Sequence, residues 1–167
     1  MESFFIRQYR HTDIDQCRNL WIELTEYHRT IYDDPSIGGN EPGLYFDSHL
    51  ARIGHESIWV VEYNNEVIGL AGLIVKDNEG EIDPLIVSAK HRGKGIGKDL
   101  VAFMIEEARK INLHYLNVKP VARNVDAINF YYNVGFRAIG QIELFIDLQK
   151  SEKWLDGIQL YGRSYQY

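Results

Sequence analysis

The chain has 167 residues, of which 45% are hydrophobic and 25% charged, and its lone cysteine excludes an internal disulfide. These values are typical of one globular domain, so we expect residues 1–167 to form a single domain. The formal net charge of −6 argues against nonspecific binding to nucleic acid or anionic membranes, and no apolar run reaches the ~20 residues of a membrane helix.

The first third of the chain predicts a strand followed by a helix. Phe4–Tyr9 has the composition of a strand. Thr12, with Asp13 and Asp15 behind it, is a typical helix start, and apolar residues then recur at helical spacing to about His28.

A loop and a second helix come next. Ile31–Gly43 is rich in turn-forming residues and predicts a loop, whereas Leu44–Ile53 predicts a short helix. Cys17 lies on the apolar face of the first helix, so we expect a core residue and not a nucleophile. The amino terminus turns polar too early for a signal peptide, and one cysteine suits a reducing compartment, so we expect a cytoplasmic protein.

The middle of the chain predicts three strands. Ser57–Tyr63 and Glu66–Lys76 are joined by Asn64–Asn65, a typical hairpin turn. A second turn at Asp77–Gly80 leads to the third strand, Glu81–Ser88. A glycine-rich loop and an amphipathic helix follow this strand.

The last third predicts three more strands and one helix. The strands are Ile111–Val118, Phe136–Leu148 and Gly157–Tyr165, and the helix is Asn124–Val134. The predicted order is therefore β-α-α-β-β-β-α-β-α-β-β. It combines antiparallel hairpins with at least one right-handed β-α-β crossover.

The glycine loop predicts a phosphate site, because the first N–H groups of a helix lack internal partners and the helix dipole favours an anion. The spacing of Gly93, Gly95 and Gly97 is one residue too short for the dinucleotide pattern G-x-G-x-x-G. Arg92 and Asp99 stand where a Walker A loop needs Gly and Ser or Thr.

What remains, R-G-K-G-I-G at Arg92–Gly97, resembles the acyl-CoA pyrophosphate loop of the GNAT superfamily of N-acyltransferases. About thirty residues downstream, Asn124, Ala127, Tyr131 and Gly135-Phe136 resemble the second motif of that family. On a helix, the first three of these residues share one face. The resemblance implies an α/β fold of the α+β type, with a central mixed, mostly antiparallel, twisted sheet flanked by helices.

The resemblance also implies acetyl-CoA as co-substrate and no metal. In the family, the strand before the glycine loop parts from its neighbour and pairs with the pantetheine arm; Pro84 suits such a bulge. A backbone N–H near Leu85 would polarise the thioester oxygen. The residues implied in CoA binding are Leu85, Ile86, Val87, Arg92, Gly93, Lys94, Gly95, Ile96, Gly97, Lys98, Asn124, Ala127 and Tyr131.

Three side chains are candidates for proton transfer. Tyr131 is the candidate general acid, since a phenol with a pKa of ~10 is protonated at neutral pH. Glu81 matches the glutamate that some family members use as base, but at ~3.3 Å per residue it lies about 13 Å from Leu85 and would act through water. Asp83 is closer, with the same expected side-chain parity. Both carboxylates could equally be solvent-exposed groups near the start of the strand, without a catalytic role.

In the family, the acceptor amine is bound by the first two helices, their loop and the last hairpin. Aromatic rings beside carboxylates suit a primary ammonium group. The candidates in this chain are Tyr27, Tyr32, Asp33 and Tyr45, together with His28, Asp34, Phe46, Glu143, Phe145 and Trp154. The same residues would also fit a polar helix end and a solvated loop.

The expected function is therefore transfer of an acetyl group from acetyl-CoA to the primary amine of a small molecule, by direct attack in a ternary complex. One alternative is a protein acetyltransferase acting on a lysine or an N-terminus. Another is a noncatalytic acyl-CoA-binding sensor. We expect no nucleic-acid or membrane partner, and a homodimer stays open.

Overall fold

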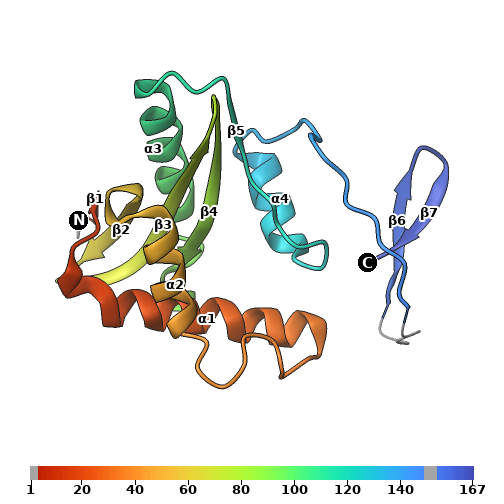
Figure 1. Cartoon of the computed structure of the whole chain (residues 1–167), viewed down its shortest axis with the longest axis horizontal. Helices are drawn as coiled ribbons and strands as arrows, with labels where there is room; N and C mark the ends of the chain where they lie inside the picture. The colour runs from red at the N-terminus through yellow and green to blue at the C-terminus, as the bar shows by residue number, and fades with distance from the viewer. Residues whose placement is uncertain (1–3, 149–153) are drawn as a thin grey trace. The chain divides into compact units, whose positions relative to one another are not determined.

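A computed structural model describes residues 4–148 and 154–167 of the chain (Figure 1). The chain divides into two compact units, Met1–Lys119 and Pro120–Tyr167. The first unit contains β1 (Phe5–Gln8), α1 (Ile14–Tyr32), α2 (Leu44–Ile53), β2 (Ile58–Tyr63), β3 (Glu66–Lys76), β4 (Glu79–Val87), α3 (Ile96–Lys110) and β5 (Tyr115–Asn117). The second contains α4 (Val125–Asn133), β6 (Asp156–Leu160) and β7 (Arg163–Gln166).

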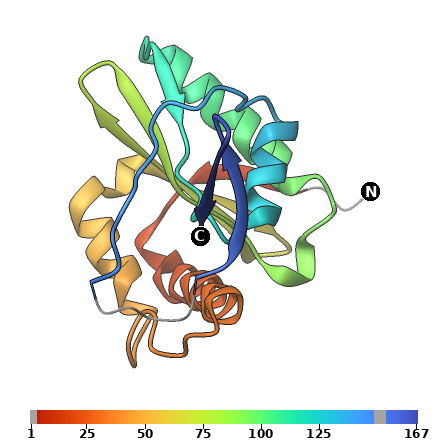
Figure 2. The ribbon, with the colours of Figure 1, turned by 90° about the vertical axis from the view of Figure 1, so that its right-hand side faces the viewer.

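The first unit is built on a five-stranded sheet in the order β1-β2-β3-β4-β5. All neighbours in it are antiparallel except β4 and β5, which are parallel and connected through α3. The predicted mostly antiparallel mixed sheet is therefore confirmed. Helices cover both faces: α1 and α2 lie on one, and α3 lies on the other, where Phe103 meets Trp59 of β2 (Figures 1 and 2).

The core of this unit lies between the sheet and the α1–α2 layer. Phe46 of α2 and Leu70 of β3 are fully buried there, with Ile58 beside them. Cys17 is also fully buried, and burial raises the pKa of its thiol to about 12. The prediction that Cys17 is a core residue is confirmed.

The start of α1 differs from the prediction. Instead of a cap at Thr12, a 3-10 turn at His11–Asp13 precedes the helix, and the carboxylate of Asp13 accepts the N–H of Arg10 at 2.8 Å. The helix also runs on to Tyr32, four residues past the expected end. It stops at Asp33, whose φ of +49° is left-handed and cannot continue a right-handed helix.

The strand expected at Ile111–Val118 is shortened to Tyr115–Asn117, because the turn that closes α3 takes up its first residues. Asn112 has a left-handed φ of +57°, and Leu113 donates its N–H to the carbonyl of Ala108 at 3.1 Å. This closing turn satisfies a helix-end carbonyl that would otherwise lack a partner.

The two final strands form at other residues than predicted. Phe136–Leu148 forms no strand and pairs with none of the described strands, although apolar residues alternate in its second half. The range expected as one strand, Gly157–Tyr165, is folded into the β6–β7 hairpin. Tyr161 and Gly162, with φ of +50° and +74°, form the tight turn that divides it.

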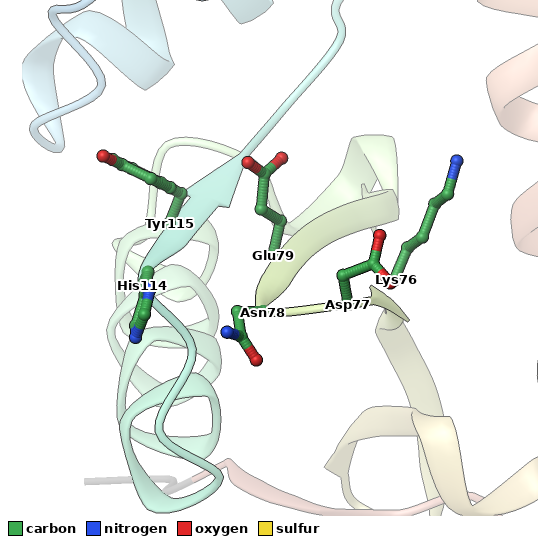
Figure 3. A pocket seen from close by; sticks show the side chains of 6 residues that line it. All are labelled: Lys76, Asp77, Asn78, Glu79, His114 and Tyr115. Carbon is green, nitrogen blue, oxygen red and sulfur yellow. The ribbon is translucent and has the colours of Figure 1, made fainter.

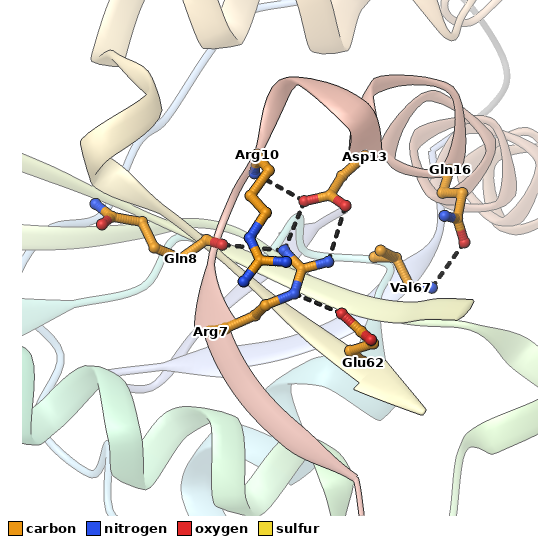
Figure 4. A network of polar contacts seen from close by, with 7 residues as sticks. All are labelled: Arg7, Gln8, Arg10, Asp13, Gln16, Glu62 and Val67. Carbon is orange, nitrogen blue, oxygen red and sulfur yellow. Dashed lines mark hydrogen bonds and ion pairs between the residues drawn. The ribbon is translucent and has the colours of Figure 1, made fainter. Parts of the chain in front are cut away.

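An ion-pair network ties β1 to the start of α1 and to β2 (Figure 4). Arg7 donates two hydrogen bonds to Asp13, at 2.7 and 2.8 Å, and a third from Nε to Glu62. Only 4% of the Asp13 side chain is exposed. Burial raises the pKa of Asp13, but the hydrogen bonds from Arg7 and from the Arg10 N–H outweigh it, so the pKa lies below its ordinary value.

We expect Asp13→Asn to lower the free energy of unfolding at neutral pH by about 3 kcal/mol, because it removes the more buried of the two carboxylates that pair with Arg7. The lowered pKa means that this stabilisation is present above pH ~4 and is lost as the pH falls through the folded-state pKa. Urea unfolding at pH 7 and pH 3 should show a smaller pH dependence in the variant. Asp15→Asn is the control, since that side chain is 83% exposed and should change little.

Candidate active site

A β-bulge interrupts the pairing of β3 with β4. Ala71 pairs with Leu85 and Leu73 pairs with Ile82, so that two residues of β4, Asp83 and Pro84, stand opposite Gly72 alone. The bulge expected from Pro84 is confirmed. A Cβ at Gly72 would overlap the carbonyl oxygen of Asp83, so the close approach of the two strands requires glycine.

The strands β4 and β5 part next to this bulge. Their parallel register covers only Glu79–Glu81, opposite Tyr115–Asn117. The rest of β4 is paired with β3 on its other edge. This is the parting of strands that the sequence resemblance implied.

The ladder with β3 fixes the direction of the β4 backbone groups beyond the parting. Ser88 donates its N–H to the carbonyl of Ile68 at 2.8 Å, which makes these two residues a hydrogen-bonded pair. Such pairs alternate along an antiparallel ladder, so Ile86 also faces β3. Leu85 and Val87 therefore direct their N–H and C=O groups toward the opposite edge, the one that β5 leaves.

The bulge changes which side chains share a face. Leu85 is paired with Ala71 on the α3 face of the sheet, whereas Asp83 contacts His49 and Arg52 of α2 on the other face. The expected common parity of Asp83 and Leu85 is therefore wrong, because the extra residue of the bulge reverses the alternation.

Both candidate bases carry ion pairs. Glu81 pairs with Lys119, and 23% of its side chain is exposed. Asp83 Oδ2 lies 3.3 Å from Arg52 Nη2 and 4.0 Å from His49 Nδ1, with 42% of its side chain exposed. Asp83 is thus the more accessible of the two carboxylates.

His49 is the buried neighbour of Asp83 on α2. Arg52 Nη2 lies 3.0 Å from His49 Nδ1, and because guanidinium groups only donate, this ring nitrogen accepts. Burial lowers the pKa of His49, against the opposing charge of Asp83, so the ring is neutral near pH 7. The His49 ring also packs against Trp21, with the ring centroids 5.2 Å apart.

The glycine loop ends at the amino terminus of α3. Gly93 and Gly95 have φ of +75° and +86°, values that favour glycine, and a Cβ built on either would meet no atom within 4 Å. Gly95 is the N-cap of α3 and makes no side-chain cap. The loop therefore presents open space in front of helix-end N–H groups, as an anion site requires.

The side chains around the loop differ in burial: one apolar side chain is buried in the core, and two lysines are exposed to solvent. Ile96 is buried with 3% exposure and fixes the first turn of α3, where Gly97 also lies. Lys94 and Lys98 are exposed. Arg92 instead turns back: its Nε donates to the carbonyl of Val87 at 3.0 Å. That carbonyl thus has a partner within the chain.

The second unit places the other motif on α4. Asn124 caps this helix by accepting the N–H of Ala127 at 3.0 Å. Tyr131 packs between Phe130 and Phe136, with ring centroids 5.2 and 5.7 Å away. Gly135 has the expected positive φ, +116°, at the helix end.

The acceptor candidates are scattered over the chain. Tyr27 lies under the Arg92 guanidinium, 5.5 Å from ring centroid to Cζ, and therefore belongs to the loop region. Phe46 is fully buried, so its expected role in acceptor binding is wrong. Tyr32 and Asp33 end α1, and Tyr45 is 54% exposed on α2.

Sequence reasoning missed Glu23, His49 and Arg52. Glu23 of α1 accepts hydrogen bonds from Ser88 and Ala89, which lie 65 and 66 residues further along the chain. His49 and Arg52 are spaced i, i+3 on α2, a weak local signal that they share a face. No sequence signal identifies their distant partners.

A hollow of about 340 Å³ lies at the turn between β3 and β4 (Figure 3). Its lining residues are Lys76, Asp77, Asn78, Glu79, His114 and Tyr115. Neither the β4 bulge nor the glycine loop contributes to it. This hollow is therefore separate from the candidate site.

The bulged strand and the glycine loop before α3 are the parts expected of an acyl-CoA-dependent transferase. The model of the Acetyltransferase (GNAT) family matches residues 14–136, and the chain belongs to this family. The family resemblance inferred from the two motifs is thereby confirmed.

Similar proteins agree with this assignment. The chain is 34% identical over 93 residues to N-acetyltransferase 8F1 of Rattus norvegicus, covering 52% of this chain and 42% of that protein. It is 33% identical over 119 residues to N-acetyltransferase family 8 member 2 of the same species, covering 66% and 50%. It thus spans half or less of the length of these relatives.

Among solved structures, an acetyltransferase of the GNAT family from Staphylococcus aureus has the same fold. The TM-score is 0.68 at 17% identity, covering 83% of this chain and 87% of that one. None of the helices within residues 4–148 and 154–167 combines the length and apolar character that a bilayer span requires.

Proposed function

We propose that this protein transfers an acetyl group from acetyl-CoA to the primary amine of a small molecule. The observation that carries the proposal is the course of β4, which is bulged at Asp83 and Pro84, parts from β5 after Glu81, and leads into a glycine loop at the head of α3. One strand thus joins an edge for a pantetheine arm to a site for a pyrophosphate.

The chain would hold acetyl-CoA mainly by backbone groups. The N–H groups of residues 93–98 would bind the pyrophosphate, with Lys94 and Lys98 adding positive charge. Leu85 would donate its N–H toward the thioester oxygen, where negative charge develops during attack. Asn124, Ala127 and Tyr131 on α4 would contact the arm, as the family motif implies.

Acetyl-CoA supplies the activated acyl group. The amine nitrogen forms a bond to the carbonyl carbon, and the bond from that carbon to sulfur breaks. Asp83 would accept the proton that the amine loses, since it is more exposed than Glu81 and faces the α1–α2 layer. Tyr131 would give its phenol proton to the departing thiolate.

An amine acceptor is supported by the chemistry around Asp83. The carboxylate and the nearby Trp21 ring, which packs on His49, are groups that attract an ammonium. The family match spans residues 14–136 and so crosses the boundary between the two units. We propose that both units belong to one catalytic domain.

Thiol release from acetyl-CoA tests the proposal. The assay would compare small primary amines with peptides that offer a lysine or a free N-terminus. We expect turnover with one or more small amines and none with peptides. Turnover of peptides alone would identify a protein acetyltransferase, and CoA binding without turnover of any amine would identify a sensor.

A further inference from the structure

The end of β4 and the start of the glycine loop are held by one carboxylate from α1. Glu23 Oε1 accepts a hydrogen bond from the Ser88 hydroxyl at 3.1 Å, and Oε2 accepts one from the Ala89 N–H at 2.8 Å. Ala89 opens the short 3-10 turn that leads into the loop. Glu23 therefore fixes the direction in which the chain leaves the sheet.

The same helix face makes a second contact with the loop. Tyr27 stands four residues after Glu23, so the two side chains are neighbours on α1. The Arg92 guanidinium lies over the Tyr27 ring, 5.5 Å from its centroid, while its Nε holds the Val87 carbonyl. We call Glu23 and Tyr27 the α1 clamp.

The clamp is tied to the sheet two turns earlier on α1. Gln16, seven residues before Glu23, accepts the Val67 N–H at 2.7 Å (Figure 4). The start of β3 and the end of β4 are neighbours, since Ser88 donates to Ile68. Helix α1 is therefore held against β3 through Gln16 and against the end of β4 through Glu23.

The charge of Glu23 is unexpected for a loop that binds an anion. A carboxylate near the loop repels a pyrophosphate, so electrostatics alone would favour an uncharged residue at this position. The two hydrogen bonds from Ser88 and Ala89 supply a reason to keep it.

We infer that Glu23 is a positioning residue for CoA binding, which acts by holding residues 88–92 so that the glycine loop faces the pyrophosphate. This inference rests on the proposed function. In this role Glu23 acts through Ser88 and Ala89 and not by contact with the ligand. Its removal should therefore weaken CoA binding through the loop and leave the chemical step unaffected.

The test uses Glu23→Gln and Glu23→Ala in the whole chain. Hydrogen exchange of residues 88–95 without ligand should become about tenfold faster in Glu23→Ala, with β3 unchanged, because the Ala89 N–H loses its acceptor. In Glu23→Ala, the Kd for CoA should rise about tenfold, which is the order expected for the loss of one charge-assisted hydrogen bond. The KM for acetyl-CoA should rise and kcat should stay constant.

Glu23→Gln separates positioning from electrostatics, because it removes the charge and keeps the shape. Positioning predicts nearly wild-type CoA binding in Glu23→Gln, since the amide oxygen can still accept the Ala89 N–H and the amide NH2 can donate to the Ser88 hydroxyl, and weaker binding only in Glu23→Ala. Electrostatic repulsion alone predicts tighter binding in both variants. Glu26→Gln is the matched control, since Glu26 lies on the same helix, pairs with Arg29 and is 56% exposed.

Three results would contradict the inference or the function beneath it. Unchanged exchange of residues 88–95 in folded Glu23→Ala overturns the clamp. Equal CoA affinity of wild type and Glu23→Ala overturns the positioning role and leaves the proposed function standing. A wild-type protein that does not bind CoA overturns the proposed function, whatever the exchange rates are.

Discussion

Gly95→Glu is expected to raise the Kd for CoA by at least about 100-fold, since like charges brought together cost several kcal/mol and each 1.4 kcal/mol is tenfold. A Cβ at this position enters open space at the head of α3. The new carboxylate would stand where the helix amides accept an anion. Isothermal titration with CoA measures the effect.

Gly39→Glu is the matched control. Gly39 also has a positive φ, +61°, and a Cβ there would likewise meet no atom within 4 Å, but it lies in the loop between α1 and α2. Both variants should lose about 1–2 kcal/mol of stability from backbone strain. Only Gly95→Glu should lose CoA binding, and equal affinities would refute the pyrophosphate site.

Tyr131→Phe is expected to lower kcat by about 100-fold, the lower end of what a general acid contributes. The ring is kept, so its packing against Phe130 and Phe136 should persist and the KM for acetyl-CoA should change little. Steady-state kinetics from pH 6 to pH 10 measure both effects.

The neighbouring Tyr132 provides the control. It is 55% exposed and packs under Arg137, with 5.1 Å between ring centroid and Cζ. Tyr132→Phe should keep the wild-type rate. If Tyr131→Phe matches it at every pH, Tyr131 is not the general acid.

Local signals predicted the first unit well. The bounds of α2 and β3 are those expected, and Asn64 and Asn65 form the hairpin turn with φ of +50° and +65°. These elements depend on turn-forming residues and on the regular spacing of apolar residues, and both signals come from residues close together in the sequence.

The rest depends on contacts between distant residues. The alternating segment 136–148 satisfies the pattern of a strand, but a strand also requires a partner ladder, which sequence does not supply. Pro84 indicated a bulge without giving its size, so the reversed face of Asp83 was missed. In the sequence, nothing distinguishes Glu23 from other carboxylates on a helix. Its hydrogen bond with Ser88 is known only from the fold.

The parting of β4 from β5 also bears on the tendency of the protein to aggregate. Within residues 4–148 and 154–167, no strand pairs with this edge beyond Glu81, so the backbone groups of Leu85 and the N–H of Val87 lie at an edge of the kind that promotes pairing between molecules. Arg92 covers only the Val87 carbonyl. A pantetheine arm lying along this edge would therefore also block such pairing between molecules. The protein should accordingly aggregate least during storage when acetyl-CoA is bound.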